Sequence, residues 1–143
     1  MDHLHSLELQ AEVDAPRERV YELLATAKGL GRWLDEAELE ARFEGPVRIR
    51  MTDAVATGQV LSIQPPQHIS FSWAWEGEDA RSGTVVAFDA IDHGSRTHVT
   101  VRQVGFRTRE QRSLHEALWA YWFGRFQEAV ESRAREPEGR SAG

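Results

Sequence analysis

The N-terminal part of the chain alternates apolar and polar positions in the way expected of a strand with one buried face. The apolar positions of this stretch are Leu7, Leu9, Ala11 and Val13. They predict a strand over residues 5–13. Pro16 then favours the start of a helix, because the missing N–H of proline costs nothing at the first helical position. We expect this helix to break at residues 28–31, which contain two glycines, and residues 32–34 to form a short helical turn or a loop.

The middle of the chain continues the alternation and predicts a run of antiparallel strands. A hairpin is expected from residues 37–43 and 47–51, around the turn Glu44-Gly45-Pro46. Further strands are expected over residues 56–63, 69–75, 82–91 and 97–104, with turn-forming residues between them. The sequence therefore predicts seven strands that connect in series.

The pattern changes to a helical period towards the C-terminus. From residue 109 to residue 133, apolar side chains recur at three- and four-residue steps, at Leu114, Leu118, Trp122, Phe126 and Ala129. The last stretch is polar, contains Pro137, and is expected to fray. We therefore expect one domain over residues 1–134, followed by a flexible tail over 135–143.

Composition narrows the function classes. The chain has 143 residues, 41% hydrophobic and 28% charged, which fits one globular domain. Its net charge of -6 argues against binding to a nucleic-acid backbone. The absence of cysteine excludes disulfides, thiolate nucleophiles and cysteine-ligated zinc. No export signal and no apolar run long enough for a membrane span are visible, so we expect a cytoplasmic protein.

Several short motifs resemble those of one superfamily when they are taken in order. Ala15-Pro16-Arg17-Glu18-Arg19-Val20-Tyr21 is similar to its Ala-Pro-x-x-x-Val-aromatic opening, and Leu30-Gly31-Arg32-Trp33-Leu34 lies where its first tryptophan falls. The later motifs are Gly58-Gln59-Val60, Pro65-Pro66, Ile69 to Trp73, Thr84-Val85-Val86, and Thr97-His98-Val99 to Gly105-Phe106. Over residues 5–133 the chain thus resembles the START-like, helix-grip (SRPBCC) superfamily.

The branch that the chain resembles contains proteins similar to the C-terminal domain of the activator of the ninety-kilodalton heat-shock chaperone's ATPase. The resemblance implies an α+β fold in which a curved seven-stranded antiparallel sheet grips a long C-terminal helix, with two short helices after the first strand. Gln103 stands where this branch usually has a histidine, and Ala120-Tyr121-Trp122-Phe123 is bulkier than its usual pattern. A co-chaperone normally carries a separate chaperone-binding domain, so we do not expect stimulation of a chaperone ATPase.

Large aromatic side chains form the most informative feature for function. Ile69, Phe71, Trp73 and Trp75 occupy every second position of one strand, and the C-terminal helix supplies more rings. Such a wall predicts an internal apolar cavity with a few polar groups, although filling of an ordinary core explains it equally well. The candidate ligand-binding residues are Trp33, Phe71, Trp73, Trp75, Phe88, Gln103, Phe106, His115, Trp119 and Trp122.

Two of these candidates carry polar groups that could act in chemistry. His115 lies on the apolar face of the helix and could bind a ligand oxygen or move a proton, which makes it a weak catalytic candidate. The more common alternative is a core histidine whose ring is satisfied by a backbone carbonyl. Gln103 shares the parity of Val99 and Val101, so its amide could serve a ligand or tie down the following loop.

The remaining polar residues give weak signals. Arg48 and Arg50 alternate outward and favour solvent exposure. His3 and His5 share a strand face, but nothing fixes a third ligand beside them, so no metal and no cofactor are expected. Asp89 is interpreted as part of a solvated surface. The sequence contains no Ser-His-Asp order, phosphate loop or nucleophile elbow that we could identify.

Three functions remain open at this stage. The first is a non-catalytic carrier or sensor of a small apolar or amphipathic molecule. The second is an enzyme similar to the superfamily's cyclases and hydrolases, with His115 as acid–base group and Gln103 orienting a carbonyl. The third is a protein-interaction or stress-related module without a ligand, for which a homodimer is one arrangement. Fold alone does not choose among them.

Overall fold

Seven strands form one antiparallel sheet in the order β1-β7-β6-β5-β4-β3-β2. The computed structural model describes residues 4–51, 53–78 and 83–135. The strands are β1 (His5–Val13), β2 (Glu36–Leu39), β3 (Pro46–Met51), β4 (Ala54–Gln64), β5 (His68–Trp75), β6 (Thr84–His93) and β7 (Arg96–Phe106). Strands β2 to β7 follow one another in series as expected, whereas β1 pairs with β7. The start of the sixth expected strand, Ser82, and the expected tail from residue 136 onward lie outside the described residues.

Three helices accompany the sheet: α1 (Arg17–Ala25), α2 (Ala27–Leu30) and α3 (Arg109–Arg135). The break expected at residues 28–31 is wrong, because those residues belong largely to α2, and the chain breaks at Thr26 instead. Thr26 has an extended backbone, and its Oγ1 accepts a hydrogen bond from the Gly29 N–H at 2.8 Å, which caps α2. A Cβ on Gly29 would lie 2.0 Å from the carbonyl oxygen of Glu22, so only glycine fits there.

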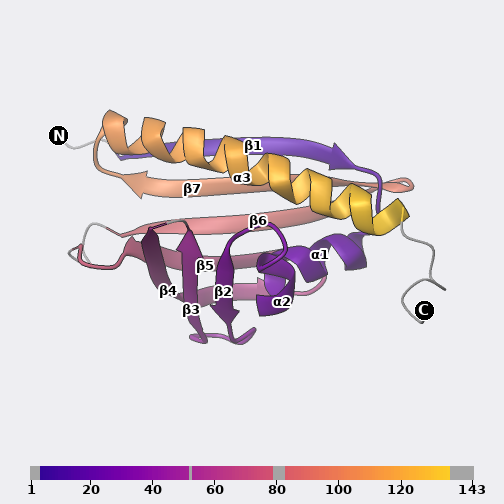
Figure 1. Cartoon of the computed structure of the whole chain (residues 1–143), viewed down its shortest axis with the longest axis horizontal. Coiled ribbons are helices and arrows are strands. Elements are labelled where there is room, and N and C mark those ends of the chain that lie inside the picture. The colour runs from indigo at the N-terminus through magenta and orange to yellow at the C-terminus, as the bar shows by residue number, and fades with distance from the viewer. Residues whose placement is uncertain (1–3, 52, 79–82, 136–143) are drawn as a thin grey trace.

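The long helix covers one part of the sheet. In Figure 1, α3 runs along β1 and β7, while β2, β3, β4 and the two short helices lie on the other side of β6. This is the α+β helix-grip architecture that the sequence predicts. None of the helices in the described part of the chain is long and apolar enough to cross a membrane.

The core lies between α3, the short helices and one face of the sheet. Alternate residues of β5 and β6 face it, including Ile69, Phe71, Trp73, Val86 and Phe88, all of which are buried. Trp33 comes from the loop after α2 and is fully buried, and its Nε1 donates a hydrogen bond to the Leu23 carbonyl at 2.8 Å. The aromatic positions on β5 therefore define the concave face of the sheet, as the period-2 pattern predicts.

Strand β4 contains a bulge that changes which side chains face the core. Val60 pairs with Phe71 and Ser62 pairs with Ser70, so Leu61 is left without a partner in the β4–β5 register. Val60 is fully buried, whereas Leu61 is exposed. A bulge of this kind inserts one residue and re-aims the side chains that follow it. The alternation of the strand therefore restarts in the other phase after Leu61.

Candidate functional site

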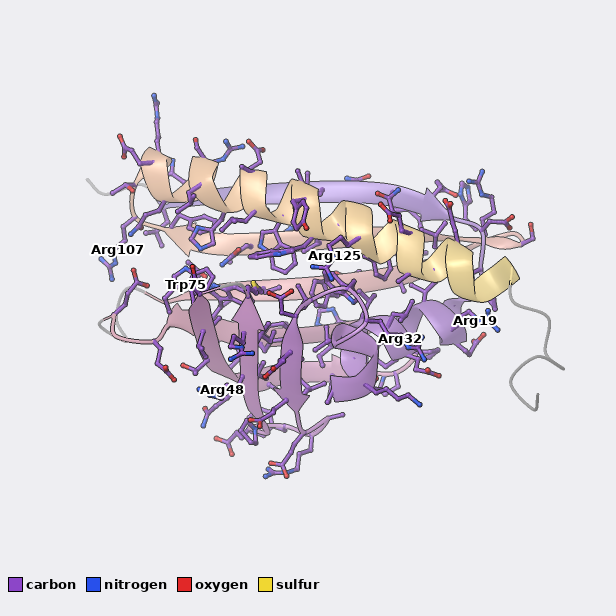
Figure 2. All side chains as sticks on the ribbon, viewed as in Figure 1. Arg19, Arg32, Arg48, Trp75, Arg107 and Arg125 are labelled. Atoms are coloured by element: carbon purple, nitrogen blue, oxygen red, sulfur yellow. The ribbon has the colours of Figure 1, made fainter. Side chains whose placement is uncertain are left out.

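A small pocket lies between the N-terminal half of α3 and the ends of β5, β6 and β7. Its volume is about 140 Å³. The residues that line it are Trp73, Trp75, Glu78, Thr84, Phe106, Gln111, Leu114 and His115. Figure 2 shows Trp75 beneath the N-terminal half of α3, on the side of strands β3 to β5. Four of the ten ligand-binding candidates from the sequence therefore meet at this place.

His115 is held by two hydrogen bonds inside this pocket. Its Nδ1 lies 2.7 Å from the Gln111 carbonyl, which can only accept, so Nδ1 carries the proton. Its Nε2 accepts a hydrogen bond from Trp75 Nε1 at 2.9 Å. Burial lowers the pKa of His115, partly opposed by the Gln111 bond and by the charge of Glu78. The imidazole is therefore neutral and points inward, and both of its nitrogens are engaged within the protein.

Trp73 provides a polar group that the fold leaves unused. The side chain is 2% exposed, and its Nε1 has no hydrogen-bond partner among the described residues. Buried polar groups are nearly always paired, and a buried donor without an acceptor costs about 1–3 kcal/mol. The indole N–H of Trp73 is thus a buried donor without an acceptor, on a side chain that also lines the pocket.

Gln103 joins the sheet to α3 through its amide. Its Oε1 accepts a hydrogen bond from Trp119 Nε1, and its Nε2 donates to Thr84 Oγ1, each at 2.6 Å. Thr84 in turn makes a long contact of 3.4 Å with the Trp73 carbonyl. Gln103 and Trp119 are both fully buried. Both ends of the Gln103 amide are therefore taken up in holding α3 against β6 and β7.

The other aromatic candidates contact one another in the core. Trp33 lies 5.9 Å from Phe88 and 6.2 Å from Trp119 between ring centroids, and Phe71 lies 5.7 Å from Phe88. These are ordinary edge-to-face and tilted contacts. A large cavity between these rings is not confirmed. The pocket of about 140 Å³ beside Trp73 and His115 lies at the end of this ring cluster.

An apolar groove adjoins the pocket on the outside of the molecule. It is lined by Met51, Asp53, Ala54, Trp75, Leu114, Leu118 and Trp122, with a volume of about 330 Å³. Trp75 and Leu114 line both spaces. Leu114 is 58% exposed at the boundary, although the sequence pattern placed it on the apolar face of the helix. The pocket and the groove are therefore neighbours that share two side chains as walls.

The charged and metal candidates lie elsewhere. Arg48 and Arg50 are exposed, as expected, and pair with Glu76 at 3.6 Å and Glu36 at 2.7 Å. Figure 2 shows Arg48 on the side of the sheet away from α3. His3 lies outside the described residues. Within residues 4–51, 53–78 and 83–135, no group of three or more His, Asp or Glu side chains is placed to hold a metal ion.

One constellation escaped the sequence analysis. Ser62, His68 and Asp89 lie side by side on β4, β5 and β6, on the face of the sheet opposite the core. Ser62 Oγ is 2.7 Å from His68 Nε2, and His68 Nδ1 is 2.8 Å from Asp89 Oδ1. The sequence-based statement that no Ser-His-Asp order exists is therefore wrong, and Asp89 is not a simply solvated carboxylate. The sequence pattern did not indicate this cluster, because Ser62 reaches the outer face only through the bulge in β4.

The fold is shared with several solved structures. Protein MLL2253 from Mesorhizobium loti is 19% identical with a TM-score of 0.81, and the match covers 90% of this chain and 98% of that one. The Aha1 dimer from Colwellia psychrerythraea is 17% identical with a TM-score of 0.78, and covers 89% and 96%. DynU16, a protein in the dynemicin biosynthetic locus, is 18% identical with a TM-score of 0.79; this chain spans 47% of its length and is covered over 88%. At these identities the likeness shows the fold.

Sequence comparison places the chain more closely. A search of curated proteins found no match. The family described as Activator of Hsp90 ATPase homolog 1-like protein matches residues 14–131, from just after β1 almost to the end of α3. Because this match spans most of the chain, the protein belongs to the Activator of Hsp90 ATPase homolog 1-like family within the START-like, helix-grip superfamily.

Proposed function

We propose that the protein binds a small amphipathic molecule in the pocket beside Trp73, with one aromatic or alicyclic ring inside and an oxygen acceptor on the Trp73 indole N–H. The observation that carries this proposal is the buried Nε1 of Trp73, which lacks a partner in the described structure while its side chain lines an open space. Apolar walls with a few placed polar groups are the usual composition of ligand sites.

The size of the pocket sets the chemical class. A cavity of about 150 Å³ accommodates one benzene molecule, and the pocket here is of similar volume, about 140 Å³. A ring carrying a carbonyl or hydroxyl oxygen therefore fits the pocket itself. An apolar tail of a longer ligand would lie in the adjoining groove, against Leu118 and Trp122.

The pocket favours binding over catalysis. An acid–base role for His115 would require its Nε2 to give up the hydrogen bond from Trp75 while Nδ1 stays on the Gln111 carbonyl, and burial lowers its pKa. The Gln103 amide is likewise engaged with Thr84 and Trp119. A carrier or sensor therefore uses these groups as they stand, whereas a cyclase-like enzyme would have to rearrange them.

The test compares two probes of equal size that differ in one acceptor. Benzaldehyde and toluene would be titrated into the 15N-labelled protein, and the five tryptophan indole N–H signals followed by NMR. We expect benzaldehyde to shift the Trp73 signal, assigned with Trp73→Phe, and to bind more tightly than toluene. In Trp73→Phe the preference for benzaldehyde should disappear.

A second pair of variants tests the location. Leu114→Arg would narrow the mouth of the pocket and should weaken binding of benzaldehyde, because Leu114 lines it. Ala120→Arg, also at an exposed position on α3, is the matched control and should leave binding unchanged. If neither probe moves the Trp73 or Trp75 signals, the proposal fails.

A further inference from the structure

Three neighbouring strands place a serine, a histidine and an aspartate together on the face of the sheet that points away from the core. His68 pairs directly with Asp89 across β5 and β6, and Ser70 pairs with Ser62 across β5 and β4. Directly opposite and diagonal positions on one face are close enough for side chains to interact. The distances of 2.7 Å from Ser62 to His68 and 2.8 Å from His68 to Asp89 are those of formed hydrogen bonds.

The bulge at Leu61 is what brings the serine to this face. In a regular strand Val60 and Ser62 would point to the same side, because successive side chains alternate. Val60 is buried against the core, yet Ser62 lies on the outer face with Ser70 and His68. Ile63 then faces Ile69 and returns to the core side. The extra residue thus re-aims Ser62 towards the histidine without removing an apolar side chain from the core.

The hydrogen-bond partners fix the direction of each proton. An ionised Asp89 carboxylate can only accept, so His68 Nδ1 carries a proton, and in the neutral imidazole Nε2 is then left to accept. Ser62 therefore donates its hydroxyl proton to His68 Nε2. Ser70, whose Oγ lies 2.5 Å from Ser62 Oγ, then donates to Ser62. This is the arrangement of nucleophile, general base and orienting carboxylate that defines a catalytic triad by geometry.

The three side chains lie at the surface of the sheet, where Ser62 is half-buried. The His68 side chain is 23% exposed and that of Asp89 is 41% exposed. Strand β3 pairs with β4 only as far as Gln59, so residues 61–64 form an edge of the sheet. The bulged Leu61 also stands outside the β4–β5 register beside the serine. A small molecule can therefore approach Ser62 both from the face and from the edge.

We propose that Ser62 is an activated nucleophile, with His68 as its general base and Asp89 as the group that orients the imidazole, and that it acts on small esters with good leaving groups. Ser62 Oγ attacks the ester carbonyl carbon while its proton passes to His68 Nε2. The carbon–oxygen bond to the leaving group breaks, and His68 returns the proton to the departing alcohol. Water, activated by His68, then hydrolyses the acyl-serine and releases the carboxylic acid. The site lies on the opposite face of the sheet from the pocket beside Trp73 and is independent of it.

The test uses a fluorophosphonate probe on the full-length protein. Ser62 Oγ would displace fluoride from phosphorus, with its proton taken up by His68, and peptide mass spectrometry would locate the adduct. We expect one adduct, on Ser62, and none in Ser62→Ala. His68→Gln should lower the labelling rate roughly 100-fold or more, the usual contribution of a general base. Asp89→Asn should also slow labelling. Ser113→Ala, at an exposed serine on α3, is the matched control and should label like the wild type.

A turnover assay completes the test. The wild type should hydrolyse p-nitrophenyl acetate faster than Ser62→Ala, with circular dichroism confirming that the variant is folded. The proposal is overturned if the wild type labels no faster than Ser62→Ala, or if His68→Gln labels as fast as the wild type. In the first case the three side chains serve only to tie three strands together.

Discussion

The buried amide of Gln103 provides the sharpest test of how the sheet holds α3. In Gln103→Leu the side chain keeps much of its volume but loses both hydrogen-bonding groups. The Trp119 indole N–H, which is fully buried, is then left without its acceptor at 2.6 Å. The Thr84 hydroxyl loses a donor at the same distance but keeps its contact with the Trp73 carbonyl. The damage therefore falls mainly on Trp119.

The expected cost follows from these losses. A buried donor left unpaired costs about 1–3 kcal/mol, and the second hydrogen bond adds about 1 kcal/mol. We therefore expect the free energy of unfolding to fall by about 2–4 kcal/mol. For a domain of this size each kcal/mol corresponds to roughly 2–4 °C, so the melting temperature should fall by about 5–15 °C.

The measurement is equilibrium unfolding in urea, and the m-value should be the same in the variant and in the wild type. Gln67→Leu, at an exposed turn position, is the control and should change stability by less than about 0.5 kcal/mol. Trp119→Phe should lower the free energy of unfolding by at least about 1 kcal/mol less in a Gln103→Leu background than in the wild type. In the wild type it breaks the hydrogen bond to Gln103, whereas in Gln103→Leu it removes a donor that is already unpaired. A Gln103→Leu protein as stable as the wild type would refute the reasoning.

Two further predictions concern the first loop and the pocket. Gly29→Ala should lower the free energy of unfolding by more than about 3 kcal/mol, because the new Cβ would overlap the Glu22 carbonyl. The control Gly31→Ala should change it by less than about 1 kcal/mol, because Gly31 has right-handed helical angles and its Cβ would lie 3.4 Å from the nearest atom. Chemical denaturation of both variants checks this. For His115, the folded-state pKa lies below the ordinary value of 6.5. The unfolded chain therefore binds the proton first as pH falls, so His115 makes the protein less stable as pH drops below about 6.5. Urea unfolding between pH 5 and 7 should show a weaker pH dependence in His115→Gln, and an identical slope in both proteins would contradict the assignment.

Much of the fold could be predicted because the spacing of hydrophobic residues indicates which segments are strands and which are helices. Phe71 and Trp73 alternate with small polar residues, and only a strand with one buried face explains that spacing. The inward position of His115 followed in the same way from the helical period. Local boundaries were harder. Phe43 was expected in a strand, but β2 ends at Leu39 and Phe43 is exposed, since the turn begins earlier than its composition indicates.

The site was less predictable, because it depends on distances that periodicity does not contain. The pattern placed Phe71, Phe88 and Trp119 on facing surfaces, but it could not show that these rings would contact one another while Trp73 borders an open space. The triad of Ser62, His68 and Asp89 was missed for a different reason. Reading β4 as a regular strand places Ser62 on the same face as Val60, and only the structure shows the inserted residue that separates them.

The pairing of β1 with β7 has a consequence for how the chain is made. Val13 pairs with Thr97 and His5 with Phe106, so β1 leaves the ribosome roughly 90 residues before its partner strand β7. At about 5–20 residues per second, that interval is of the order of 5–20 s. During this time the apolar side chains of β1, including Leu7 and Val13, have no sheet to cover them. For that interval the nascent chain therefore carries an unpaired strand with one apolar face, which can associate with other chains.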